Sequence, residues 1–118
     1  RMSVESKYYA IVGYDLTGYE TDKFKDWKWT DEGEKYTCNQ VKDRIQIFYD
    51  PMSGMHLYLG YILGGGDQYK TETTKINLKD INDKVGLVFD ELVKLQDLGV
   101  IKKNLQEKCQ FIMFEESY

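Results

Sequence analysis

Much of the chain alternates apolar and polar positions, as β-strands do. The stretch 7–16 carries apolar residues on both faces, which predicts a strand in the middle of a sheet. Residues 44–63 form two alternating runs around a Pro51 to Gly54 turn, which predicts a β-hairpin. Further strands are expected at 34–38, 70–76 and 108–114.

One segment in the second half has helical spacing. Its apolar residues recur three and four positions apart, at Leu78, Ile81, Val85, Val88, Leu92 and Leu95. We expect a helix over about 78–98, with Asn77 as its N-cap and Gly99 at its end. Gly86 disfavours the helix, and close packing of that position against the sheet would explain its presence.

The order of these elements indicates an α+β fold. We expect an antiparallel sheet of about five strands, including the hairpin 44–63, with the helix 78–98 packed on one face. The length fits one domain over 1–118, and Arg1, which precedes Met2, is interpreted as a residue added by cloning. The stretch 19–33 has no strand period and is expected to be a loop insertion.

A short helix over 22–27 is expected inside this insertion, because it would place two large aromatics on one face. Phe24 and Trp27 lie three positions apart and would share that face, while Trp29 would fall outside it. A tryptophan left in a charged segment is costly to expose, so Trp29 is the better candidate for a contact site.

The charge of the chain argues against nucleic acid. Sixteen basic and twenty acidic residues give a net charge of −4, and Arg44 is the only arginine besides Arg1. Duplex binding needs a basic surface and favours arginine forks, so no duplex partner is expected. No stretch is long and apolar enough for a membrane helix, and no signal-peptide pattern is present, so a cytoplasmic location is expected.

Enzymatic chemistry has few candidate residues. His56 is the only histidine, and Cys38 and Cys109 are too far apart in sequence to form a metal pair. Ser53 lies in a turn without the flanking glycine of a nucleophile elbow. The carboxylates match no known site spacing. We therefore expect no enzyme activity, no metal and no cofactor.

Aromatic residues are abundant, with ten tyrosines, five phenylalanines and two tryptophans. Such residues can pack on a sheet, anchor a protein interface or stack on a nucleotide ring. The candidate protein-interface residues, surrounded by an acidic rim, are Tyr19, Trp29, Tyr58 and Tyr69.

A glycine-rich segment at 64–67 supports a second hypothesis. Consecutive glycines can turn backbone N–H groups toward a phosphate, although the spacing matches no nucleotide-binding motif and also fits a plain loop between strands. The candidate ligand-binding residues are Arg44, Gly64, Gly65, Gly66, Lys70 and Thr71.

The composition is rich in lysine and tyrosine and almost free of arginine and proline. In this it resembles small phage-encoded accessory proteins of low-GC Gram-positive bacteria. The resemblance implies a protein that works by binding, inhibiting or sequestering a host factor such as a defence protein. A non-enzymatic binding protein is therefore predicted, with a nucleotide-type ligand binder as the alternative. A homodimer through a strand edge, or through Leu87 and Val93, is also compatible with the sequence.

Overall fold

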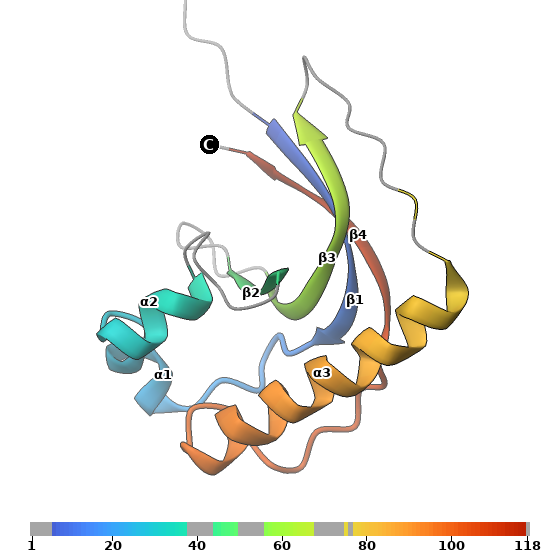
Figure 1. Cartoon of the computed structure of the whole chain (residues 1–118). Helices are drawn as coiled ribbons and strands as arrows, with labels where there is room; N and C mark the ends of the chain where they lie inside the picture. The colour runs from blue at the N-terminus through green and yellow to red at the C-terminus, as the bar shows by residue number, and fades with distance from the viewer. Residues whose placement is uncertain (1–5, 38–43, 50–55, 68–74, 76, 118) are drawn as a thin grey trace, which may run out of the picture.

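The computed structural model describes residues 6–37, 44–49, 56–67, 75 and 77–117 (Figure 1). In chain order the elements are β1 (Ser6–Asp15), α1 (Asp22–Trp27), α2 (Asp31–Thr37), β2 (Ile45–Tyr49), β3 (Leu57–Asp67), α3 (Leu78–Asp97) and β4 (Gln110–Ser117). The fold is α+β, with an antiparallel sheet and one long helix, as predicted.

The sheet has the strand order β2-β3-β1-β4. The central place of β1 confirms the prediction made from its two apolar faces. The sheet has four strands within the described residues, against about five expected. The strand predicted at 34–38 is wrong as far as Thr37, because α2 occupies that stretch. Three acidic residues lie in the first turn of α2, and the Thr30 hydroxyl accepts the Gly33 N–H at 3.1 Å, which favours a helix start.

Strand β3 is longer than predicted. The expectation of a loop at 64–67 is wrong, because Gly64, Gly65 and Gly66 pair with Ala10, Tyr9 and Tyr8 of β1. The register shifts between Ala10 and Ile11, and glycine suits a strand at such a bulge and where backbones approach closely. A Cβ at Gly65 would lie 2.4 Å from the Tyr8 carbonyl oxygen. The predicted turn 50–54 lies outside the described residues, as does the strand 70–76 except for Lys75, which is not in a strand.

Helix α3 lies across one face of the sheet and packs on β1 and β3, while the ends of β1, β3 and β4 extend beyond it (Figure 1). Both predicted helix ends are confirmed. The Asn77 side chain accepts the Asp80 N–H at 2.9 Å, and Gly99 adopts a φ of +80°. The main core contains Tyr14, Leu16, Phe24, Ile45, Ile47, Leu57, Leu59, Val88, Leu92, Leu95, Val100 and Ile101. Leu78 was expected in the buried stripe, but it is exposed in the first turn of α3.

A second, smaller cluster of aromatic rings joins β2, β3 and β4 to β1. Its members are Tyr9, Phe48, His56, Tyr58 and Phe114, with ring centroids 4.8–5.7 Å apart in the contacting pairs. Tyr9 and Phe114 are register partners, so this cluster belongs to the face that alternates with the Tyr14 side of β1. The sheet therefore buries apolar groups on both faces.

Close backbone contact between β1 and β3 depends on glycine. Gly13 and Gly60 are register partners, and a Cβ at Gly13 would lie 1.9 Å from the Leu59 carbonyl oxygen. Gly86 is different, because a Cβ there would have no neighbour within 4 Å. The expectation that Gly86 packs closely against the sheet is therefore wrong.

These two glycines give a matched pair of substitutions. Gly13→Ala is expected to lower the free energy of unfolding by about 2 kcal/mol or more, because backbone must move to admit the methyl group. Gly86→Ala is expected to raise it by about 0.5–1 kcal/mol, because alanine favours a helix interior. Urea denaturation measures both changes, and a Gly13→Ala variant as stable as the wild type would contradict the close strand approach.

Candidate protein-interaction surfaces

Large apolar side chains are exposed on two surfaces that include aromatic rings, apart from the exposed leucines Leu78, Leu87 and Leu98. We call the turn between α1 and α2, residues 28–30, the Trp29 corner; Trp29 is 69% exposed there. We call the second surface the β4 strip, and it consists of Tyr8, Phe89, Phe111 and Met113, which are 47–83% exposed. Exposed apolar groups of this size mark candidate contact sites when they gather on one surface.

The backbone of the Trp29 corner is held by hydrogen bonds. The Trp29 N–H donates to the Asp26 carbonyl at 3.2 Å, and the Thr30 N–H donates to the Trp27 carbonyl at 3.0 Å. The Thr30 hydroxyl also donates to the Trp27 carbonyl, at 2.6 Å, and so links the end of α1 to the start of α2. A Cβ at Gly33 would lie 2.0 Å from this same carbonyl oxygen, so the two helices meet closely.

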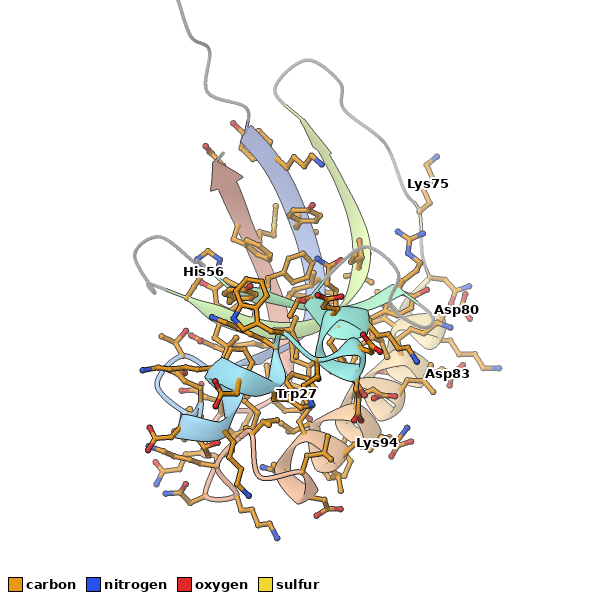
Figure 2. All side chains as sticks on the ribbon, turned by 90° about the vertical axis from the view of Figure 1, so that its left-hand side faces the viewer. Trp27, His56, Lys75, Asp80, Asp83 and Lys94 are labelled. Carbon is orange, nitrogen blue, oxygen red and sulfur yellow. The ribbon has the colours of Figure 1, made fainter. Side chains whose placement is uncertain are left out.

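The two tryptophans of this region have opposite environments. Trp27, labelled in Figure 2, is the last residue of α1. It packs between Phe24 and Tyr36, with ring centroids 6.0 and 5.6 Å away, and its buried Nε1 has no hydrogen-bond partner among the described residues. Phe24 is itself buried in the main core. Trp29 is left outside this packing, as its position in the sequence predicted.

A cation lies beside Trp29. The Lys28 Nζ is 5.5 Å from the ring centroid of Trp29 and 4.9 Å from that of Tyr49. Exposed carboxylates lie nearby in the sequence on both sides, at Asp26, Asp31 and Glu32. The corner thus offers an exposed indole ring and a lysine positioned by aromatic rings, with acidic residues around them.

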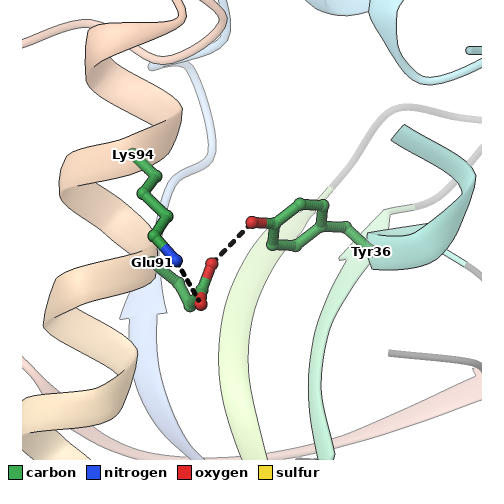
Figure 3. Close-up of polar contacts among 3 residues, drawn as sticks. All are labelled: Tyr36, Glu91 and Lys94. Atoms are coloured by element: carbon green, nitrogen blue, oxygen red, sulfur yellow. Dashed lines mark hydrogen bonds and ion pairs between the residues drawn. The ribbon is translucent and has the colours of Figure 1, made fainter. Parts of the chain in front are cut away.

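A hydrogen bond connects this helix pair to α3. The Tyr36 hydroxyl donates to Glu91 Oε2 at 2.5 Å, and Lys94 Nζ lies 3.3 Å from Glu91 Oε1 (Figure 3). Burial, followed by the bond to Glu91, raises the pKa of Tyr36 well above its ordinary value of 10.0. The contact fixes α2 against α3 and so positions the corner that carries Trp29.

The other predicted interface residues lie elsewhere. Tyr19 is half-buried against the main core, and its carbonyl accepts the Lys102 N–H at 2.8 Å. Tyr58 belongs to the second aromatic cluster, where its ring stacks on His56 at 4.9 Å. Burial, and then the charge of Asp15, raises the pKa of Tyr58. Tyr69 lies outside the described residues.

The structure gives the predicted phosphate site a different backbone. Gly64, Gly65 and Gly66 are paired strand residues, and the positive φ angles of the described residues are at Arg44, Gly18 and Gly99. The three glycines therefore do not form the turn that directs successive N–H groups to an anion. Arg44 donates from Nε to the Ile62 carbonyl at 3.1 Å and lies over the Tyr61 ring. Lys70 and Thr71 lie outside the described residues.

In the described part of the chain, no three or more His, Cys, Asp or Glu side chains are grouped so that they could hold a metal ion. None of the helices there is long and apolar enough to cross a membrane. Cys109 is a free thiol next to Tyr14. Burial raises the pKa of Cys109, which lowers the fraction of the reactive thiolate form at neutral pH.

The β4 strip follows from the topology of the sheet. β4 pairs with β1 alone among the described strands, and Phe111 and Met113 lie opposite Val12 and Ala10. Helix α3 packs on β1 and β3. On that same face of the sheet, Phe111 and Met113 of β4 are exposed. The alternation along 108–114 predicted a strand here, but it carried no information on the place of that strand in the sheet.

Phe89 belongs to the same side of the molecule. The buried ridge of α3 runs through Val88, Leu92 and Leu95, and Glu91 lies on the flank that contacts α2 through Tyr36. Phe89 lies on the opposite flank of that ridge by helical spacing. Because the strand order ends at β4 on the side away from β2, this flank points toward β4.

Comparison with known proteins gave no relatives: no family model, no curated protein and no solved structure matches this chain.

Tyr36→Phe tests the link between α2 and α3. Loss of the bond to Glu91 is expected to lower the free energy of unfolding by about 0.5–1.5 kcal/mol at neutral pH. The folded-state pKa of Tyr36 is raised, so the stability that it contributes is present below pH 10 and decreases as the pH rises above 10. Urea denaturation across this range should show the two proteins converging in alkali. A constant difference between them would contradict the raised pKa.

Proposed function

We propose that this protein is a non-enzymatic binding protein that occupies the surface of a protein partner with the Trp29 corner. The observation that supports this most directly is a tryptophan 69% exposed on a backbone held by hydrogen bonds. The compositional resemblance to phage accessory proteins suggests a host protein as the partner, in which case binding would inhibit or sequester it.

Tryptophan is well suited to this role. It offers a large, rigid contact area with few rotatable bonds, so little conformational entropy is lost on binding. Tryptophan is enriched among the residues that dominate binding energy at protein interfaces. The turn that carries Trp29 is ordered by Thr30 before any partner binds, which reduces the cost further.

The charges around Trp29 favour a partner surface of mixed character with a basic part. Lys28 is held over aromatic rings, where it can meet a carboxylate, and the carboxylates of Asp26, Asp31 and Glu32 can attract a basic rim. The chain as a whole carries a net charge of −4, which increases the rate of encounter with a basic partner. The mechanism is a steric block and requires no covalent step.

The nucleotide-type ligand remains the alternative, but none of the described contacts favours it. Its predicted glycines are strand residues, and two of its side chains, Lys70 and Thr71, lie outside the described residues. A thermal shift with a nucleotide panel separates the two proposals, since the Trp29 corner predicts no shift.

Trp29→Ala is expected to weaken partner binding by about 30-fold or more, the effect of losing an interface hot spot. The melting temperature should change little, because the side chain is largely exposed and is not among the residues packed against the main core. A partner is first identified by cross-linking in a Gram-positive lysate, and the purified partner is then titrated against each variant.

Leu78→Ala is the matched control, because Leu78 is 76% exposed but lies at the start of α3. It should bind as tightly as the wild type. Equal affinity of the Trp29→Ala variant and the wild type would rule out the Trp29 corner as the binding surface.

A further inference from the structure

We infer that the edge of β4 that has no partner among the described strands pairs with the same edge of a second copy of this chain, in antiparallel orientation, to form a homodimer with one continuous sheet. This inference rests on the β4 strip and does not depend on the role of Trp29.

The first five residues of β4, 110–114, lack the usual protection against pairing, whereas Glu115 and Glu116 follow them in the same strand. Proteins normally protect an edge strand with charges, proline, a bulge or a short length. β4 is eight residues long, its register with β1 is uninterrupted, and residues 110–114 contain neither charge nor proline. Among the described residues it pairs with β1 alone. Such an edge can accept another strand.

The residues of β4 are complementary to themselves. In an antiparallel pair the residues that face each other project from the same side of the sheet. A two-fold axis at Ile112 places Phe111 opposite Met113 of the second copy, and the same contact occurs a second time by symmetry. These two side chains are 61% and 83% exposed. One strand thus supplies both halves of an apolar contact.

Neighbouring registers fit less well. An axis at Met113 would set the apolar Phe111 opposite the exposed carboxylate of Glu115. An axis at Phe111 would set Met113 opposite Cys109, which is already half-buried against the main core. Among these three registers, only the Ile112 register opposes uncharged residues throughout 110–114, and it also sets the two exposed large apolar side chains of the strand against each other, which favours a second copy over an unrelated strand.

Pairing of the two edges would cover apolar surface on both copies. Phe111 and Met113 are the members of the β4 strip that lie on β4 itself, and each copy would cover them on the other together with the edge backbone.

A cysteine at the proposed axis tests the register. In a Cys38→Ala and Cys109→Ala background, Ile112→Cys should form a disulfide-linked dimer on mild oxidation. Directly opposed Cα atoms lie about 4.5–5.5 Å apart, within the range of a disulfide. Gln110→Cys is the matched control. Its symmetry mates would be four residues out of register, about 13 Å apart, and should not cross-link.

A charge in the strip tests the interface without an added bond. Wild-type protein should sediment as a concentration-dependent dimer, and Met113→Lys should weaken dimerisation at least about 10-fold, since each lysine would be buried against Phe111. The exposure of Met113 means that the fold should survive, as circular dichroism can verify. Leu78→Lys, equally exposed but outside the strip, should leave the dimer intact.

The inference is overturned by any of three results: a wild-type monomer at all concentrations, a Met113→Lys dimer as tight as the wild type, or equal cross-linking of the two cysteine variants. The first of these results has a special case. If the wild type is a monomer that binds a different protein, and Met113→Lys abolishes that binding, the edge of β4 is the binding surface for that other protein and the homodimer is ruled out.

Discussion

The width of a single helix limits how this sheet can be covered. An α-helix with its side chains is about 10 Å across, whereas strands lie about 4.8 Å apart, so one helix covers about two strands. α3 packs on β1 and β3, and α2 packs on β2. The described helices leave β4 uncovered on this face, and its apolar side chains remain exposed there. On β4, beyond the strands that α3 covers, Phe111 and Met113 form an exposed apolar surface that is available for contact with another protein chain.

The opposite face explains why β4 is firmly held although it lies at the edge. Its Phe114 ring contacts Tyr9, Phe48 and Tyr58, so one side of β4 is anchored by aromatic packing. Tyr9 lies on β1 and Tyr58 on β3, and these two strands approach each other closely at Gly13. β4 is therefore packed on one face, through Phe114, and exposes Phe111 and Met113 on the other. Because the strand is ordered before a partner binds, less conformational entropy is lost on binding.

Local signals were predictable from the sequence, whereas features set by strand order were not. Asn77 and Gly99 mark the ends of α3, and the spacing of Phe24 and Trp27 indicates α1, because capping and helical periodicity depend on near neighbours. The stretch 34–38 was misassigned because five residues are too few to separate a strand from a helix, and the Thr30 cap decided the outcome. The glycines at 64–66 extend β3 because β1 pairs with them, which no local pattern reports. Likewise the exposure of Trp29 was predictable, but that of Met113 was not, because it depends on β4 lying at the edge.

If the edge of β4, which the described helices leave uncovered, is a contact surface, the exchange of its amides should depend on protein concentration. Hydrogen–deuterium exchange of the wild-type chain in dilute and in concentrated solution measures this. We expect slower exchange of the 110–114 amides in the concentrated sample, where the edge is paired, with unchanged exchange at residues 28–30. Exchange of β4 that is independent of concentration would contradict this pairing.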